Sequence, residues 1–251
     1  MILNYMDLNS KVYIVNKKSG ITSKEMADII KEKHNLKKIC FCGRLDPMAR
    51  GKMLLLGDEM CKQMDNHQQY DKTYQFEIVF GLQTDTDDFL GKLEQFRHVD
   101  NPILLSQDIK KKLEEYPRDI LQNFHKYSSI CIDGEPLWLH TKKNKEVKKI
   151  PAHNVKIKSL EVLELIETKF EPFLSNIIET IESINDKHDF RQDEIVSQWI
   201  NFNNTFDKVF SLKVEIKVSS GFYIRQFVRD LSEQINFPLV VNDINRTDIN
   251  C

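Results

Sequence analysis

The chain has 251 residues, enough for one large catalytic domain or two small ones. Hydrophobic residues make up 41% and charged residues 29% of the chain, which is typical of an ordinary globular protein. No apolar run approaches the roughly 20 residues that a membrane helix needs, so no membrane partner is expected. The formal net charge of −2 excludes a uniformly basic molecule, so any contact with nucleic acid must come from local clusters of cations.

Five cysteines at irregular spacing predict free thiols in a reducing compartment. The amino terminus lacks the apolar core of a signal peptide. We therefore expect a cytoplasmic protein, although the sequence leaves the nucleus and organelles open. Cys40 and Cys42 have no second Cys/His pair at zinc spacing, so no metal is expected.

The first predicted elements are a short strand over residues 12–15 and a helix that begins after Thr22. Thr22 and Glu25 have the spacing of a capping box, in which each side chain accepts a hydrogen bond from a main-chain amide of the other residue. Apolar residues at helical spacing after Glu25 give this helix one buried face.

Residues 43–51 form a predicted turn that is bounded by glycines and centred on Asp46. Pro47 fixes its own φ and biases Asp46 away from helix, so that the carboxylate can be held in one orientation. A surface turn is the more common reading of such a sequence taken alone. Arg44 and Arg50 are the nearby candidates for an ion pair with Asp46.

The later elements alternate between strands and helices. Alternating apolar residues predict half-buried strands over residues 73–80 and 210–218, and the second pattern is the clearest in the chain. Helices are predicted over residues 106–116 and 224–235, and one or two strands over 155–166. This order indicates an α+β protein with a mixed sheet.

Four segments occur in a fixed order along the chain. They are Gly43-Arg44-Leu45-Asp46-Pro47-Met48-Ala49-Arg50-Gly51, Lys72-Thr73-Tyr74, Thr84-Asp85-Thr86-Asp87-Asp88-Phe89-Leu90-Gly91 and Ser219-Ser220-Gly221-Phe222-Tyr223-Ile224-Arg225. Together they resemble the TruB family of RNA pseudouridine synthases, from about Val12 to Arg246. The resemblance implies the pseudouridine synthase fold, with a mixed, mostly antiparallel sheet flanked by helices and loops.

The resemblance also implies the domain organisation. We expect a single catalytic domain over residues 1–251, without the small C-terminal RNA-binding domain, called PUA, that family members often carry. Residues 169–208 fit the family pattern poorly and contain apolar residues at helical spacing. We interpret them as a helical insertion packed on the core, with an interaction surface as the alternative.

The implied activity is the isomerisation of a uridine in RNA to pseudouridine, which needs no cofactor. A single carboxylate can act at the sugar–base bond, much as in retaining glycoside hydrolysis, and Asp46 is the predicted nucleophile. The resemblance assigns Arg225 as the cation that keeps Asp46 ionised. An arginine at the start of a helix is otherwise poorly placed, which favours such a carboxylate partner.

Four further residues are predicted to contact the substrate by the same resemblance. Tyr74 stacks on the target base and is the candidate for proton removal at C5, although a strand tyrosine is more often part of the core. Ile244 packs beside the base, or is an ordinary core residue. Tyr223 lies where a strand turns into a helix, and Lys17 lies near the floor of the site.

The expected partner is RNA, and the resemblance implies uridine 55 in the T-loop of tRNA, reached by flipping the base out of its stack. We expect the protein to act as a monomer. The lysine-rich run over residues 142–149 accompanies aromatic residues, which suits an RNA backbone with exposed bases, although a solvated face is the simpler reading. The predicted RNA-binding residues are Arg44, Phe41, Asp85, Lys142, Lys143 and Lys148.

Several residues depart from the family pattern, but the predicted catalytic residues are unchanged. Phe41 replaces a histidine, Arg44 replaces a small residue and Cys131 replaces a lysine. These changes leave the identity of the RNA open. Two alternatives are a non-catalytic RNA-binding or RNA-folding module, and a guide-RNA-dependent synthase subunit acting on other RNA.

Overall fold

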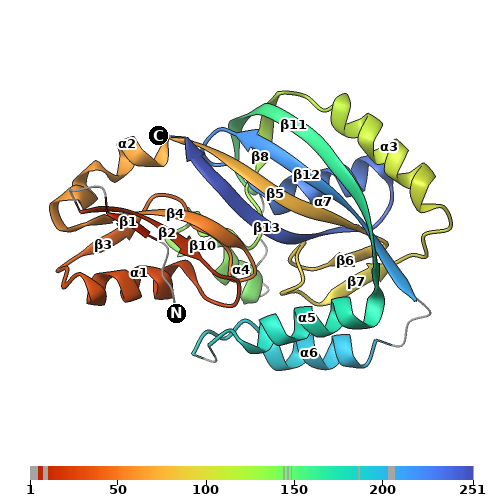
Figure 1. The fold of residues 1–251 in the computed structure, drawn as a ribbon, viewed down its shortest axis with the longest axis horizontal. Coiled ribbons are helices and arrows are strands. Elements are labelled where there is room, and N and C mark those ends of the chain that lie inside the picture. Colours follow the sequence, from red (N-terminus) through yellow and green to blue (C-terminus); the bar gives the residue numbers. More distant parts are fainter. Residues whose placement is uncertain are drawn as a thin grey trace.

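The computed structural model describes residues 5–7, 11–143, 145, 147, 149–185, 187–202 and 207–250. Within these residues a nine-stranded sheet runs through the whole molecule (Figure 1). Its strands are β1 (Tyr5–Asp7), β2 (Val12–Lys17), β3 (Ile39–Phe41), β4 (Arg50–Gly57), β5 (Asp71–Phe80), β8 (Asp119–Asn123), β11 (Ala152–Lys169), β12 (Lys208–Val218) and β13 (Leu239–Asn250).

The strands follow one another in the order β1-β2-β4-β13-β5-β12-β11-β8, and β3 also pairs with β4. The described pairs are antiparallel apart from β4 with β13, which run parallel where Arg50 meets Asn245 and Gly51 meets Arg246. The predicted α+β fold with a mixed, mostly antiparallel sheet is therefore confirmed.

Helices and short hairpins surround this sheet. In the part of the chain that the structure describes, none of the helices is both long enough and apolar enough to cross a membrane. The helices are α1 (Ser23–Lys33), a 3-10 helix (Asp58–Gln63), α2 (Met64–Gln68), α3 (Pro102–Glu114), α4 (Leu137–Lys142), α5 (Phe170–Glu182), α6 (Gln192–Ile200) and α7 (Ile224–Ile235). The short strands are β6 (Leu82–Thr84), β7 (Leu93–Phe96), β9 (Cys131–Ile132) and β10 (Glu135–Pro136).

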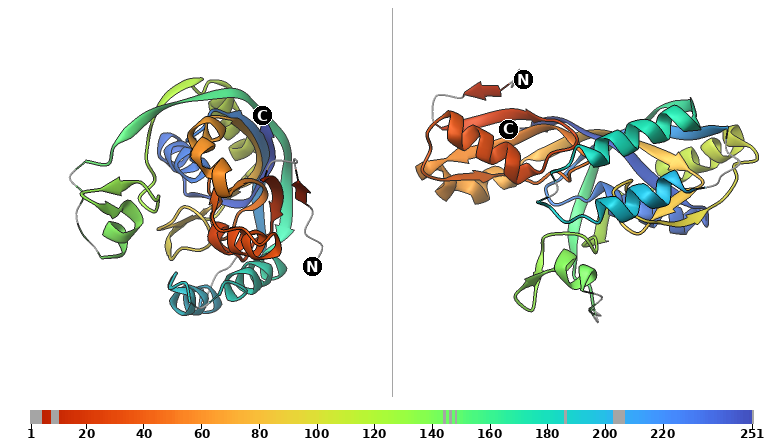
Figure 2. Two further views of the ribbon diagram at one scale, coloured as in Figure 1. Left: turned by 90° about the vertical axis from the view of Figure 1, so that its left-hand side faces the viewer. Right: turned by 90° about the horizontal axis from the view of Figure 1, so that it is seen from below.

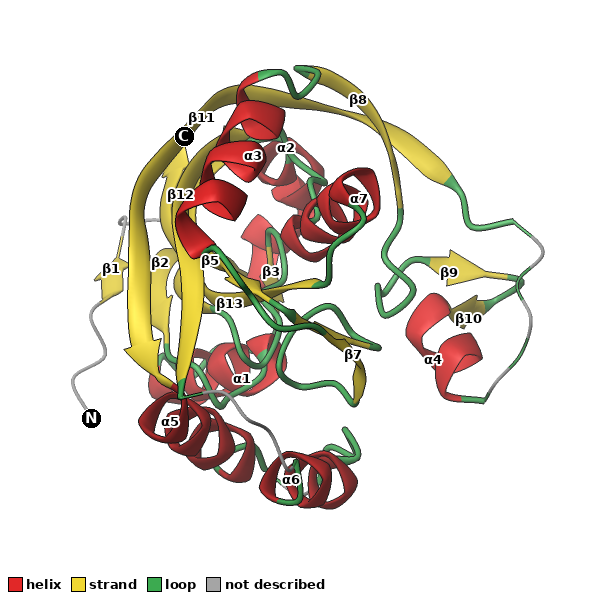
Figure 3. Ribbon diagram, turned by 90° about the vertical axis from the view of Figure 1, so that its right-hand side faces the viewer, coloured by secondary structure: helices red, strands yellow, loops and turns green. Residues whose placement is uncertain are grey.

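The two larger hydrophobic cores of the described residues lie on different sides of the sheet. The strands β8, β11 and β12 curve around α3 and α7 (Figure 3), and the apolar face of α7 packs on the inner side chains of β5 and β12 in the main core. The second core lies between α5, α6 and the loop after β6, and it contains Trp199 and Phe89. Phe89 and Leu90 of the loop that follows β6 belong to this second core.

A small lobe formed by β9, β10 and α4 projects from this body (Figure 2). It lies in the connection between β8 and β11, and it contains the first residues of the lysine-rich run. Lys142 is the last residue of α4, so the run begins at the end of a helix.

The predicted elements differ from the observed ones mainly at their ends. The capping box of α1 is present, since Thr22 and Glu25 exchange main-chain to side-chain hydrogen bonds of 2.7 and 3.1 Å. The helix expected over 106–116 begins earlier, at Pro102, because Asn101 caps it and proline is tolerated at its first position. The segment 155–166 is part of one long strand, β11, with two register shifts.

Residues 169–208 contain α5 and α6, which pack on each other beside the sheet. That this segment is an insertion within one catalytic domain stays a prediction.

Candidate active site

The loop between β3 and β4 holds Asp46 through main-chain contacts on both sides of it. Ser23, at the start of α1, accepts a hydrogen bond from the Leu45 amide and donates one to the Leu45 carbonyl, each at 2.8 Å. The Gly20 amide donates to the Pro47 carbonyl at 3.0 Å. The side chain of Asp46 remains 35% exposed, so a rigid backbone presents a carboxylate that solvent and ligands can reach.

Arg246 holds the two ends of this loop together, a role that the sequence did not reveal. Its buried guanidinium donates to the Lys52 carbonyl at 2.6 Å and to the Gly43 carbonyl at 3.1 Å. Gly51 has a φ of +110°, and a Cβ there would lie 2.4 Å from the main-chain oxygen of Arg246. The glycine is therefore required by both conformation and space.

Asp46 forms an ion pair with Arg225, at 2.9 Å between Oδ2 and Nε. The Arg225 side chain is 8% exposed, and its Nη1 donates to the Thr86 carbonyl at 3.0 Å. Burial alone lowers the pKa of Arg225, but the surrounding carboxylates, Asp46 first, outweigh burial and raise this pKa above its ordinary value. Arg225 is therefore a permanent cation beside Asp46.

The two arginines that flank Asp46 in sequence do other things. Arg50 forms a two-point ion pair with Asp243, with distances of 2.6 and 2.8 Å. Arg44 is exposed, and its guanidinium lies 5.3 Å from the ring centre of Phe41. Sequence proximity was therefore the wrong guide to the ion-pair partner of Asp46, because the turn directs the carboxylate toward α7 instead.

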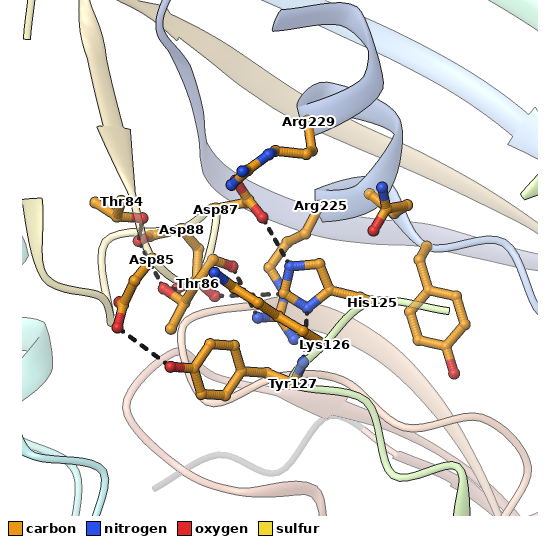
Figure 4. A network of polar contacts seen from close by, with 12 residues as sticks. Thr84, Asp85, Thr86, Asp87, Asp88, His125, Lys126, Tyr127, Arg225 and Arg229 are labelled. Carbon is orange, nitrogen blue, oxygen red and sulfur yellow. Dashed lines mark hydrogen bonds and ion pairs between the residues drawn. The ribbon is translucent and has the colours of Figure 1, made fainter. Parts of the chain in front are cut away.

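The loop after β6 surrounds Arg225 with acceptors (Figure 4). Asp88 Oδ2 lies 3.7 Å from Arg225 Nε, while Asp88 Oδ1 accepts hydrogen bonds from the Thr86 hydroxyl and the Leu90 amide at 2.8 and 3.0 Å. Burial raises the pKa of Asp88 to about 6, against the lowering effect of Arg225 and with a further raising effect of Asp46. Asp46 and Asp88 thus share one cation.

A buried polar chain lies directly behind this loop. His125 Nε2 lies 2.9 Å from Asp87 Oδ2, and Arg229 Nη1 lies 3.1 Å from Asp87 Oδ1. The Tyr127 amide donates to His125 Nδ1 at 3.2 Å, so this histidine is neutral and carries its proton on Nε2. Burial, together with the nearby Arg225 cation, lowers the pKa of His125 to about 4.

The sequence analysis did not predict these buried polar contacts. Asp87 lies within a matched segment and His125 lies outside all four, and the resemblance gives neither of them a role. The available signal was the pair of adjacent aspartates, since two buried carboxylates need two separate sets of partners.

Two of the predicted base-contacting residues, Tyr74 and Tyr223, are held in place by neighbouring side chains. Tyr74 is buried on β5, with its hydroxyl 3.5 Å from Arg246 Nη1. The main chain of Tyr223, just before α7, is held by two hydrogen bonds with the side-chain amide of Gln122 at 2.9 and 3.1 Å. Burial and the charge of Asp46 raise the pKa of Tyr223. Their contacts with a substrate stay predictions.

Ile244 lines a cavity of about 460 Å³ between α5 and the sheet. Asp88 and Ala49 also line it, whereas Asp46 and Arg225 do not. The cavity therefore lies beside the ion pair and not over it, and the predicted contact of Ile244 with the base stays a prediction.

Lys17 has a different environment from that of a substrate contact. Its buried ammonium donates to the carbonyls of Lys18, Ile21 and Pro47, at 3.0, 2.7 and 3.3 Å. Burial lowers the pKa of Lys17 to about 7, and the charge of Asp46 opposes this. The three donors of the ammonium are occupied by the main chain, so this geometry favours a role in holding the Asp46 loop.

Asp85, a predicted RNA contact, is engaged by other residues of the protein. Both of its carboxylate oxygens lie near the guanidinium of Arg191, at 2.6 and 3.2 Å. The Tyr127 hydroxyl donates to the same carboxylate at 3.2 Å. A carboxylate would also repel the RNA backbone, so the geometry argues against an RNA-binding role.

Three lysines of the lysine-rich run are paired with neighbouring acids. Lys142 forms an ion pair with Asp189, and Lys143 and Lys145 lie 2.7 and 2.9 Å from the two oxygens of Glu135. These contacts lower the pKa of Glu135 to about 2, the hydrogen bond from Lys143 contributing most. The remaining predicted cation, Lys148, lies outside the described residues.

Comparison with known proteins assigns the family. Residues 31–176, more than half of the chain, match the model of the TruB family pseudouridylate synthase N-terminal domain. The chain belongs to the TruB family. The sequence-based prediction of a TruB-family RNA pseudouridine synthase is therefore confirmed.

Curated relatives resemble this TruB-family chain over almost its whole length. The tRNA pseudouridine synthase B of Caldanaerobacter subterraneus subsp. tengcongensis is 26% identical over 94% of the chain and 67% of the relative. That of Malacoplasma penetrans is 27% identical over 97% of the chain and 87% of the relative.

Solved structures of low sequence identity share the fold. A Cbf5–Nop10–Gar1 complex matches with a TM-score of 0.53 at 16% identity, and an H/ACA RNP bound to a substrate RNA with a TM-score of 0.51 at 16% identity. Each match covers 93% of the TruB-family chain, but the chain spans only 47% and 45% of the matched chains. The expected pseudouridine synthase fold is thereby confirmed.

Proposed function

We propose that this protein isomerises a uridine of tRNA to pseudouridine, with Asp46 as the nucleophile and uridine 55 of the T-loop as the target. The observation that carries the proposal is the ion pair between the partly exposed Asp46 and the buried Arg225. The names of the curated relatives, tRNA pseudouridine synthase B, support tRNA as the substrate class.

The reaction requires that one bond to the sugar be exchanged for another. The bond between N1 of uracil and C1′ of ribose breaks, a bond between C5 and C1′ forms, C5 loses a proton and N1 gains one. Atoms and electrons balance without an oxidant, a reductant or an energy source, so we propose no cofactor and no metal. An ionised carboxylate at the sugar stabilises the positive charge that develops there, or traps it covalently.

The environment of Asp46 suits this role. The adjacent Arg225 is fixed at a second point by the Thr86 carbonyl, so the cation cannot rotate away from the carboxylate. The backbone of Asp46 is fixed by the contacts of Leu45 and Pro47 with α1 and the loop before it. Such preorganisation reduces the reorganisation that the transition state would otherwise demand.

The detached uracil must be retained and turned before C5 can attack. Tyr74, whose ring lies on the sheet beside the Arg246 guanidinium, is the proposed stacking partner and the candidate for proton removal at C5. Tyr223 and Ile244 are the proposed further walls of this base site. Stacking on an aromatic ring recovers part of the few kcal/mol that base flipping costs.

Arg44 is an exposed cation at the rim of the site. Arg44, two residues before Asp46, stacks on the ring of Phe41, and its side chain is exposed to solvent. A planar cation on an aromatic ring suits a phosphate or an unstacked base. We propose that this pair contacts the RNA beside the flipped uridine.

The proposal is tested with purified protein and two unmodified tRNA transcripts, one of which carries cytidine in place of uridine 55. Mapping of pseudouridine at single-nucleotide resolution should show one product, at position 55 of the unchanged transcript. Product at another position would move the target within tRNA. If a well-folded protein yields no product on tRNA or on total cellular RNA, the proposed activity is wrong.

A further inference from the structure

The helices α5 and α6 contact the loop that positions Arg225. Phe89, from that loop, is buried in the second core, with its ring centre 5.4 Å from that of Phe173 and 5.4 Å from that of Trp199. The loop is therefore packed between the reaction site on one side and the two helices on the other.

Arg191, at the start of α6, makes a two-point polar contact with the loop. Its backbone is left-handed, with a φ of +65°, and its guanidinium meets Asp85 through two nitrogens at 2.6 and 3.2 Å. The same guanidinium lies 5.6 Å from the ring centre of Tyr127. With only 25% of the side chain exposed, this two-point contact is stronger and more directional than an ordinary surface ion pair.

Asp85 transmits this contact to the rest of the loop. Its Oδ1 accepts a hydrogen bond from the Lys92 amide at 2.8 Å, and its amide donates to the Lys92 carbonyl at 2.9 Å. These bonds close the loop at its base. The next residue, Thr86, provides the carbonyl that holds Arg225 Nη1 at 3.0 Å.

A second set of contacts fixes α6 against the end of the same loop. Gln198 accepts from the Leu93 amide at 2.8 Å and donates to the Leu93 carbonyl at 3.2 Å, as a neighbouring strand would. Glu194 forms an ion pair with Lys92. Together with Arg191, these residues attach one face of α6 to both ends of the loop after β6.

We propose that Arg191 is a positioning residue for the Asp46–Arg225 pair. It acts through Asp85 and the Thr86 carbonyl and does not touch the reacting atoms. The inference rests on the proposed function. Since the guanidinium is occupied by Asp85 and Tyr127, its removal should slow the chemical step and leave RNA binding nearly unchanged.

The test compares wild type, Arg191→Ala, Arg191→Lys and Asp193→Ala by steady-state and single-turnover kinetics on tRNA. Asp193 is an exposed residue two positions further on in α6, so its variant controls for a change of charge on this helix. We expect Arg191→Ala to lower kcat at least about tenfold with KM within about threefold, because a partly buried charge-assisted contact is lost. Arg191→Lys should fall between, since it keeps the charge without the fork.

A wild-type kcat for Arg191→Ala would overturn the proposal. So would a raised KM with unchanged kcat, because that pattern means direct contact with RNA. Should Arg191→Ala fail to fold, Arg191→Lys decides, and a wild-type kcat in that variant overturns the proposal.

A double-mutant comparison separates positioning from a general loss of stability. Arg191→Ala and Asp85→Asn should each lower kcat. The double variant should be no slower than the slower single variant, because both substitutions disrupt the same Arg191–Asp85 contact. Fully additive losses would contradict the proposed route through Asp85. Absence of product from the wild type on any RNA would instead refute the proposed function itself.

Discussion

At the scale of single residues, the Asp46–Arg225 pair could be predicted because each residue lies in one of the matched motifs. In addition, a cation at the start of a helix needs a carboxylate partner. Its supporting groups could not be predicted. The Thr86 carbonyl that holds Arg225, and the histidine behind the loop, come together only through the pairing of distant strands. Arg50, a candidate because it is close in sequence, is instead paired with Asp243, from β13.

The buried His125 predicts a pH dependence of stability. The unfolded chain binds a proton at this residue below about pH 6.5, whereas the folded protein does so only below about pH 4. The free energy of unfolding of wild type should therefore fall relative to that of His125→Asn as the pH drops from 6.5 to 4, by up to about 3 kcal/mol. Urea denaturation of both proteins at pH 7 and pH 4.5 measures the difference, and identical pH dependence in both would contradict this account.

At the scale of elements, β12 and α7 were predictable because their apolar residues recur at strand and helix spacing over many residues. The parallel contact of β4 with β13 was not, since it joins residues nearly 200 positions apart and depends on a glycine. The partners of the lysine-rich run were also hidden, because Glu135 and Asp189 reach it from different elements.

The close approach of β13 to Gly51 predicts a steric penalty. Gly51→Ala should lower the free energy of unfolding by at least about 2 kcal/mol, since the new Cβ would overlap the main chain of Arg246. Gly134 is the matched control, because its φ is also positive, at +82°, but a Cβ there meets nothing within 4 Å. Thermal and urea denaturation compare the two variants. Equal losses would show that conformation alone, and not the contact with Arg246, sets the requirement.

At the scale of the whole molecule, the net charge of −2 and the pairing of Lys143 and Lys145 with Glu135 weaken any general attraction for RNA. Recognition must then depend on a few positions near the reaction site. The sheet connects the Asp46 loop, contributed by the amino-terminal strands, to α7 and β13 from the carboxyl-terminal part (Figure 1). Three of the four motifs, which are far apart in sequence, thereby contribute residues to one ion pair and its surroundings.

This charge distribution predicts which cations matter for RNA affinity. Arg44→Ala should weaken tRNA binding and reduce the slope of log affinity against log salt by about one, because its guanidinium is exposed at the rim. Lys143→Ala should change affinity less than about twofold, since Glu135 already pairs with this lysine. Filter binding over a range of salt concentrations tests both. A larger loss for Lys143→Ala than for Arg44→Ala would reverse the assignment.

The most direct test of the central claim is the product yield of Asp46→Asn under single-turnover conditions on unmodified tRNA. The substitution keeps the shape of the side chain but removes the charge that faces Arg225. The exposed Asp28→Asn on α1 serves as the control for handling and folding. We predict wild-type product for Asp28→Asn and no pseudouridine above background for Asp46→Asn, with both variants folded by circular dichroism. Full product formation by Asp46→Asn would contradict the assignment of Asp46 as the nucleophile.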